Sequence, residues 1–198
     1  MSMVLSYMCS RFSLQGGIKM KPQIAIVMGS KSDFPTMKKA TDMLDILGIT
    51  YSIRIYSAHR TPDELDSYIN DINECDECKA VIAGAGMSAA LSGHIASKTI
   101  KPVIGVPLSR SKLDGIDALL STTEMPPGIP VLSVGIDGAK NAALAAASIV
   151  ALSDSSLASV LADFRKEQSE DVIAANIQLN AKEGEAFSSA DLKFKCEF

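Results

Sequence analysis

Two residues able to do chemistry stand side by side in this sequence, His59 and Arg60. An imidazole exchanges protons near neutral pH, and a guanidinium presents a planar fork to a phosphate or a carboxylate. His59 is one of only two histidines in the chain, and the other is His94. Taken alone, the pair is more typical of a surface histidine in a turn beside an arginine bound to a carboxylate, so the neighbouring segments must decide between the two interpretations.

A second polar segment, residues 29–33, reads Gly-Ser-Lys-Ser-Asp and follows an apolar run. Hydroxyls and backbone N–H groups at the start of a helix form a natural anion site. The segment matches neither the GxGxxG nor the Walker A pattern, which makes dinucleotides and nucleoside triphosphates poorer candidates. Asp33 would repel a phosphate, so we expect it to accept hydrogen bonds from ribose hydroxyls or to cap the helix.

A third segment, residues 84–90, contains small residues and little side-chain bulk. A flat molecule could lie against such a backbone, or a helix could pack closely on the sheet there. His94 follows within the next predicted helix, where a lone histidine is more often a core or interface residue than a catalytic one.

Alternating apolar and polar segments predict how these residues are positioned. We expect strands at residues 24–28, 50–55, 80–83, 102–107 and 131–134, with a helix after each, and Thr61 and Glu64 predict a capping box. This order predicts an α/β fold of three layers, a doubly wound parallel five-stranded sheet. Ligands bind such sheets at the carboxyl ends of the strands, which would bring His59 close to the glycine-rich turns.

Composition restricts the remaining possibilities. A length of 198 residues with 47% hydrophobic residues suits one domain, and a net charge of −4 with 5% aromatics argues against nucleic-acid binding. The apolar runs are too short to span a membrane, and residues 1–20 lack the pattern of a signal peptide, so we expect a cytoplasmic protein. We predict a poorly ordered extension at 1–20, a single catalytic domain at 21–180 and a polar tail at 181–198.

The four cysteines predict reduced thiols rather than a metal or redox site. Cys75 and Cys78 form an isolated CxxC that closes a helix, with no second pair and no histidine beside it. Two acidic residues between them disfavour thiolates. We therefore expect neither a metal nor another cofactor.

Taken together, the motifs resemble a known family. MGSKSD (28–33), SAHRTPD (57–63), KPVIGVP (101–107), LDGIDALLS (113–121), MPPGIPV (125–131) and NAAL (141–144) are similar to those of the N5-carboxyaminoimidazole ribonucleotide mutases of purine biosynthesis. The resemblance covers about residues 21–172. It implies a flavodoxin-like fold, a ribonucleotide substrate, carbon dioxide and no cofactor. It also implies a homo-octamer in which the long last helix, predicted at 154–180, reaches a neighbouring subunit.

The resemblance assigns roles to individual residues. His59 matches the family's general acid/base, Arg60 and the Ser30 turn match its phosphate site, and Asp33 matches a ribonucleotide-binding residue. The other expected substrate-binding residues are Ser32, Ser57, Gly86, Met87 and Ser88.

One departure leaves the reaction open. The family pattern GGAAHLPG or GLAAHLPG reads Gly-Met-Ser-Ala-Ala-Leu-Ser-Gly here, so Ala90 replaces the second family histidine. The ALSG ending resembles a related branch that carboxylates aminoimidazole ribonucleotide directly with carbon dioxide, although that branch usually has SAHK. We therefore favour the mutase, keep the direct carboxylase as the alternative and a non-catalytic nucleotide-binding paralogue as the second. We further suggest that His94, four residues after Ala90, acts as an auxiliary imidazole.

Overall fold

The computed structural model describes residues 21–184, with side chains described to residue 179. The described chain falls into two units, which divide between residues 153 and 154. The first unit contains the sheet and its helices, and the second contains one long helix. The predicted single domain at 21–180 stays a prediction, and the predicted extension at 1–20 lies outside the described residues.

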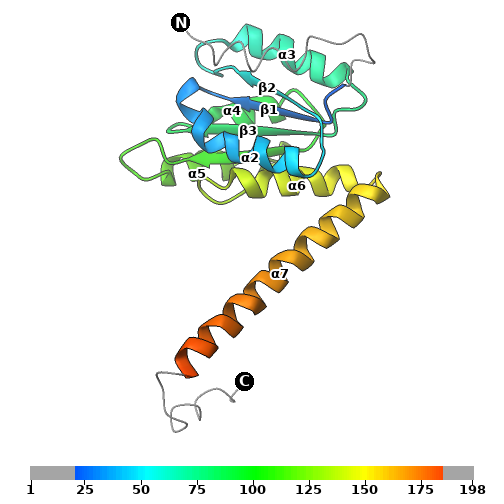
Figure 1. The fold of residues 1–198 in the computed structure, drawn as a ribbon. Helices are drawn as coiled ribbons and strands as arrows, with labels where there is room; N and C mark the ends of the chain where they lie inside the picture. The colour runs from blue at the N-terminus through cyan, green and yellow to red at the C-terminus, as the bar shows by residue number, and fades with distance from the viewer. Residues whose placement is uncertain (1–20, 185–198) are drawn as a thin grey trace, which may run out of the picture. The chain divides into compact units, whose positions relative to one another are not determined.

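The first unit is built on a parallel sheet whose strand order is β2-β1-β3-β4-β5 (Figure 1). Its strands are β1 (Ile24–Met28), β2 (Tyr51–Ile55), β3 (Ala80–Gly86), β4 (Val103–Leu108) and β5 (Leu132–Ser133). The strand order reverses beside β1, as in flavodoxin-like sheets, and ligands bind such sheets where that reversal opens a crevice. The predicted doubly wound parallel sheet is confirmed.

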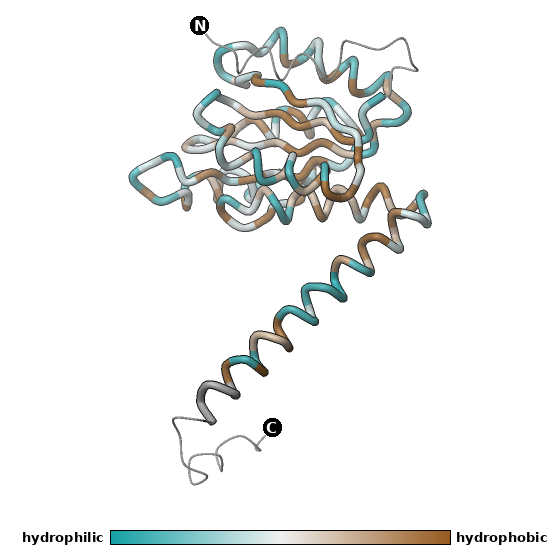
Figure 2. The backbone as a smooth tube through the Cα atoms, viewed as in Figure 1, coloured by the Kyte–Doolittle hydropathy of each residue, from teal (hydrophilic) through white to brown (hydrophobic). Residues whose placement is uncertain are grey.

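Continuous apolar runs make the central strands, since a parallel sheet is covered on both faces. Every residue of β1 and of β4 is buried. Figure 2 shows these strands as hydrophobic segments inside the unit, with hydrophilic segments outside. In the register of the sheet Met28 pairs with both Ile55 and Gly84, so the loops after β1, β2 and β3 leave the same edge together.

Helices cover both faces of the sheet. On one face α2 (Phe34–Ile46) packs against α6 (Ala139–Ala151). On the other, α3 (Pro62–Glu74) and α4 (Ala90–Ala96) bury Leu65, Ile69, Leu91 and Ile95 against Ala25, Val27, Val81 and Ala83. The helix α5 (Ile116–Thr123) lies beside α4 and β4. This packing fixes the strand ends that carry the predicted site.

Two local expectations near the site are wrong. The strand β3 continues to Gly86 instead of ending at residue 83, so Gly84 and Gly86 pair with Val106 and Leu108 rather than forming a turn. The capping box at Thr61 does not form, because its hydroxyl accepts a hydrogen bond from the Ser57 backbone N–H (2.9 Å) and donates one to the Ser57 carbonyl (3.3 Å).

Several element boundaries also differ from the prediction. The helix α4, which the sequence pattern predicts at about residues 88–99, begins at Ala90 and ends at Ala96. The edge strand β5 is shorter than the predicted 131–134 and pairs only with β4. The preceding segment contains three prolines, which cannot donate to a strand ladder.

The second unit is α7 (Ser155–Gly184), which extends beyond the predicted end at residue 180. Asp154 caps it by accepting hydrogen bonds from the backbone N–H groups of Ser156 (3.0 Å) and Leu157 (3.1 Å). Both hydrophobic and hydrophilic segments follow its length in Figure 2. Its exposed apolar residues are Val160, Val172, Ile173, Ile177 and Leu179. None of the helices between residues 21 and 184 has the length and apolar character needed to span a membrane.

Candidate active site

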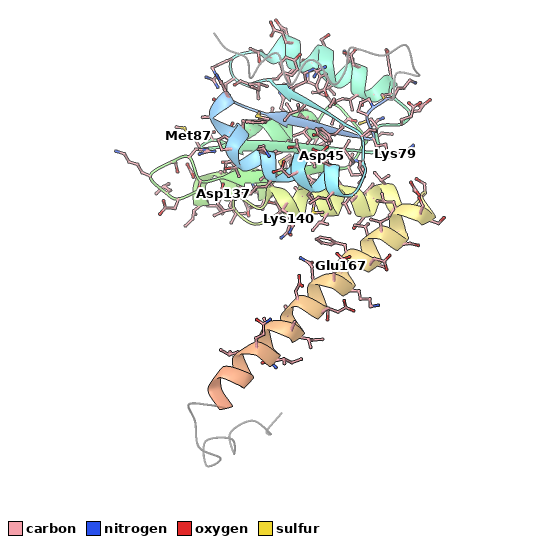
Figure 3. The ribbon with its side chains drawn as sticks, in the orientation of Figure 1. Asp45, Lys79, Met87, Asp137, Lys140 and Glu167 are labelled. Carbon is pink, nitrogen blue, oxygen red and sulfur yellow. The ribbon has the colours of Figure 1, made fainter. Side chains whose placement is uncertain are left out.

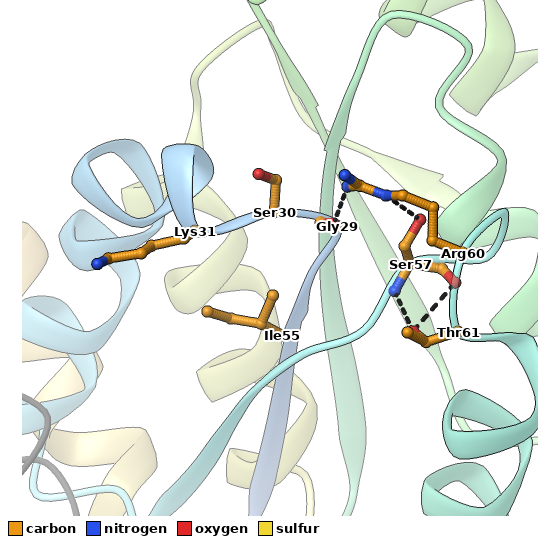
Figure 4. Close-up of a pocket in the computed structure, with 7 residues that line it drawn as sticks. All are labelled: Gly29, Ser30, Lys31, Ile55, Ser57, Arg60 and Thr61. Atoms are coloured by element: carbon orange, nitrogen blue, oxygen red, sulfur yellow. Dashed lines mark hydrogen bonds between the residues drawn. The ribbon is translucent and has the colours of Figure 1, made fainter.

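A pocket of about 310 Å³ opens where β1 and β2 end (Figure 4). It is lined by Gly29, Ser30, Lys31, Ile55, Ser57, Arg60 and Thr61. The lining therefore comes from the two polar segments that the sequence singled out. A volume of this size is at the lower end of ordinary small-molecule sites.

Arg60 joins the two loops of the pocket. Its Nη2 donates to the Gly29 carbonyl (3.0 Å) and its Nε to the Ser57 hydroxyl (3.4 Å). These bonds hold the guanidinium between the loops that follow β1 and β2 (Figure 4). The side chain is exposed, so it can also meet an anion that enters the pocket.

Ser30 is the N-cap of the short 3-10 turn η1 (Lys31–Asp33). Its hydroxyl accepts from the Ser32 backbone N–H (3.4 Å) and from the Ser32 hydroxyl (3.1 Å). Hydroxyls and backbone N–H groups thus gather at the lip of the pocket, opposite Arg60. This set of donors suits a phosphate or another compact anion.

Asp33 lies at the end of this turn and is buried, with only 6% of its side chain exposed. Burial raises the pKa of its carboxyl group, while Arg110 is the main influence that lowers it, followed by a hydrogen bond from the Ser30 backbone and by the charge of Arg60. The Arg110 Nε lies 3.5 Å from the Asp33 Oδ1. Arg110 belongs to the loop after β4, so a third strand end contributes to the site.

His59 lies on the turn between Ser57 and Thr61, which both line the pocket. Its backbone N–H donates to the Ser57 hydroxyl (3.3 Å). The residue is exposed, and its ring has no hydrogen-bond partner among the described residues. His59 is not itself part of the pocket lining, although its neighbours Ser57, Arg60 and Thr61 are, and its exposed ring is free of protein partners within the described residues.

The third predicted segment brings Gly86, Met87 and Ser88 to the same edge of the sheet. Met87 has a positive φ of 59°, which only glycine adopts without strain, and it is 59% exposed. Figure 3 shows it at one end of β3, with Lys79 at the other end. The bare backbone of Gly86 packs against Arg110, because an added Cβ would stand 2.7 Å from the Arg110 Cβ.

His94 is placed differently from the other predicted residues. Its Nε2 lies 2.7 Å from the Asp66 Oδ1 on α3, and the ring is half-buried. No hydrogen bond or ion pair joins it to the pocket lining within residues 21–179. The auxiliary role suggested for it stays a prediction, and the contact with Asp66 favours a structural role instead.

Sequence reasoning missed three polar contributors, Lys31, Thr61 and Arg110. Lys31 and Thr61 lie inside the two motifs that were chosen, and both line the pocket. Arg110 lies in a polar loop after β4 that carries no motif. Only the topology of the sheet could have indicated Arg110, because every loop at the carboxyl edge of a parallel sheet is a candidate for the site.

No group of three potential metal-binding side chains comes together in the described part of the chain. Cys75 and Cys78 are both free thiols, and Cys78 is buried. Burial raises the pKa of the Cys78 thiol. A thiol with a raised pKa is a poor nucleophile, which disfavours thiol chemistry at Cys78.

The fold and the site define a doubly wound α/β protein with a polar pocket at the carboxyl edge of its sheet. A family model described as AIR carboxylase matches residues 23–171. The chain belongs to the AIR carboxylase family.

Curated relatives agree with this assignment. The chain is 47% identical to the N5-carboxyaminoimidazole ribonucleotide mutase of Escherichia coli K12 over 153 residues, which is 76% of this chain and 90% of the relative. It is 48% identical to the enzyme of the same name from Haemophilus influenzae, over 76% of this chain and 93% of the relative. The crystal structure of Treponema denticola PurE matches with a TM-score of 0.75 and 33% identity, over 80% of this chain and 99% of that one.

Proposed function

We propose that this protein converts N5-carboxyaminoimidazole ribonucleotide into 4-carboxyaminoimidazole ribonucleotide in purine biosynthesis. The observation that carries the proposal is the pocket shared by the 29–33 and 57–61 loops, in which Arg60 spans both strand ends beside His59. The mutases of E. coli and H. influenzae, each nearly half identical to this chain, support it. The enzyme is an isomerase, and the proposed reaction needs no metal and no cofactor.

The proposed chemistry moves one carboxyl group from nitrogen to carbon. The N–C bond of the substrate carbamate breaks, carbon dioxide leaves, and the electron pair stays on the exocyclic nitrogen, which takes a proton from the His59 imidazolium. The aminoimidazole ring is then an enamine-like nucleophile, and its C4 attacks the same carbon dioxide. His59, now neutral, removes the proton from C4 and the ring regains its aromaticity. One imidazole therefore gives and recovers one proton, which suits a side chain that titrates near neutral pH.

The remaining residues would hold the substrate. We assign the phosphate to Arg60 and to the hydroxyls of Ser30, Ser32 and Ser57, since charge-assisted hydrogen bonds from a guanidinium are strong and directional. We assign Asp33 to the ribose hydroxyls, because an ionised carboxylate only accepts hydrogen bonds.

The segment Gly86-Met87-Ser88 would face the aminoimidazole ring of the substrate and keep the released carbon dioxide inside the site. Met87 and Ser88 are exposed, and the thioether of Met87 offers an apolar surface. Carbon dioxide is apolar, so an apolar cover slows its escape to water.

Direct carboxylation of aminoimidazole ribonucleotide is the second candidate, favoured by Ala90 and the ALSG sequence. The two activities are separated by supplying either the carbamate substrate or aminoimidazole ribonucleotide with bicarbonate, at low enzyme concentration. The mutase proposal expects rapid turnover of the carbamate and slow turnover of the second mixture. The reverse result would establish the carboxylase, and binding without turnover of either would establish the non-catalytic paralogue.

We also propose a cytoplasmic homo-octamer in which α7 packs on a neighbouring subunit. The exposed apolar residues of α7 support this, since a helix of this length with such residues gains stability by burying them. Light scattering during gel filtration gives the mass of the assembly. A monomeric mass would overturn the proposal.

A further inference from the structure

Arg110 links three segments of the candidate site. Its Nε lies 3.5 Å from the Asp33 Oδ1 and its Nη2 donates to the Thr36 hydroxyl (3.1 Å) in the first turn of α2. Its Cβ and Cγ pack on the backbone of Gly86, where any larger residue would collide with them. The Cβ and Cγ of Arg110 are therefore held by Gly86, its Nε by Asp33 and its Nη2 by Thr36.

Asp33 needs such a partner because it is buried. Placing a carboxylate out of water costs free energy unless an opposite charge or hydrogen bonds offset the cost. The charged groups that act on Asp33 are Arg110 from the loop after β4 and Arg60 from the loop after β2, and its own 3-10 turn carries the exposed Lys31. Arg60 already donates to Gly29 and Ser57, so Arg110 is the main counter-charge.

The loop that carries Arg110 is itself anchored. The Ser109 backbone N–H donates to the Asp137 Oδ1 (3.1 Å), and the Ser109 hydroxyl bonds to the other oxygen. In Figure 3 Asp137 and Met87 lie at the same end of the sheet. The anchor places Arg110 beside the substrate-facing residues before any ligand arrives.

We propose that Arg110 is a positioning residue that acts through Asp33, holding this carboxylate ionised and oriented to accept hydrogen bonds from the ribose hydroxyls of the substrate. The proposal rests on the proposed function, because it takes a ribonucleotide as the ligand. Arg110 itself need not touch the substrate. Its guanidinium has two polar partners within residues 21–179, and both are side chains of the protein.

The test compares Arg110→Gln, Arg110→Lys, Asp33→Asn and the double variant Arg110→Gln/Asp33→Asn. Lys112→Gln is the matched control, since it removes one positive charge from an exposed position on the same loop. Arg110→Gln should raise KM about tenfold while kcat changes little, because binding of the ground state and the transition state is lost alike. Lys112→Gln should leave KM unchanged, and thermal unfolding of each variant shows whether it is folded.

The pH dependence separates positioning from a merely structural role. Burial raises the pKa of Asp33 and Arg110 lowers it, so removing Arg110 raises that pKa further. Asp33 would then be protonated at a higher pH, and the acidic limb of the kcat/KM profile should move to higher pH in Arg110→Gln. Arg110→Lys, which keeps the charge, should move it less. A uniform loss of activity at every pH would overturn the proposal.

The double variant gives the decisive result. If Arg110 acts through Asp33, then Arg110→Gln causes no further rise in KM once Asp33 is asparagine. The effects of two substitutions within one contact are not additive. Additive effects would overturn the proposal and would indicate that Arg110 contacts the substrate directly. Wild-type turnover tests the proposed function separately. Should the wild type turn over neither substrate, the same comparison is made with the affinity for aminoimidazole ribonucleotide.

Discussion

The Nε2 of His94 lies 2.7 Å from the Oδ1 of Asp66, and Lys98 bonds to the other oxygen of the same carboxylate. This cluster ties α4 to α3 on the face of the sheet that these two helices cover. One of the two histidines of the chain is thereby given a protein partner, while the ring of His59 has none among the described residues. The two imidazoles can therefore be tested against each other.

The same substitution at both histidines should have opposite effects on turnover. His59→Asn should lower kcat about 10²–10⁴-fold with little change in KM, since that is the usual contribution of a positioned acid/base. His94→Asn should leave kcat within about twofold, because its ring is bound to Asp66 and not to the pocket. Steady-state kinetics with the carbamate substrate measures both. A large loss of kcat in His94→Asn, confirmed in His94→Ala and His94→Gln, would instead support the auxiliary role.

Asp66 should make stability depend on pH in the acid range. The hydrogen bonds from Lys98 and then His94 lower the pKa of the Asp66 carboxyl below its ordinary value. A carboxyl with a lowered folded-state pKa stabilises the fold above its unfolded pKa of about 3.9 and loses that contribution as pH falls through the folded value. The wild type should therefore exceed Asp66→Asn in free energy of unfolding at pH 7, and the difference should be smaller at pH 3. Urea unfolding at the two pH values decides this, and an unchanged difference would contradict it.

The sequence was enough to predict the sheet and several residues of the pocket lining, because both depend on local patterns. Buried parallel strands such as β1 and β4 are continuous apolar runs, and their order follows from alternating strands and helices. Gly29, Ser30 and Arg60 were predicted because they lie in short motifs. The contact between Arg110 and Asp33 was not predicted, since it joins residues 77 positions apart through side chains alone.

Other misses have equally physical causes. Thr61 was expected to cap α3, but its hydroxyl can bond either the helix or Ser57, and only the folded loop decides between them. The partner of His94 on α3 depends on how two helices pack against the sheet. Competition between alternative partners of one polar group cannot be resolved from spacing along the chain.

Gly105 in β4 should not tolerate a methyl group. An added Cβ would stand 2.3 Å from the Cγ2 of Thr122 and 3.0 Å from the Cγ1 of Val131. Gly105→Ala should therefore lower the free energy of unfolding by about 1–3 kcal/mol, the usual cost of overpacking. The rescue variant is Thr122→Ser, which removes the colliding methyl and keeps the hydroxyl that donates to the Ala118 carbonyl (2.8 Å). Denaturant unfolding of the two single variants and the double variant measures the coupling, and a double variant as unstable as the sum of its parts would refute the clash.

Met87 should separate backbone strain from side-chain function at the edge of the pocket. Its φ of 59° costs a residue with a Cβ about 1–2 kcal/mol, whereas glycine adopts it freely but loses about 0.5–1 kcal/mol through the entropy of its unfolded chain. Met87→Gly should thus equal or exceed the wild type in free energy of unfolding, while Met87→Ala, which keeps the Cβ, should gain nothing. Both variants lack the exposed thioether, so a cover over the carbon dioxide would be lost in both. Denaturant unfolding with parallel assays of turnover gives the answer: a Met87→Gly variant less stable than Met87→Ala would show that the backbone is unstrained, and full turnover in both would show that the thioether does not cover the substrate.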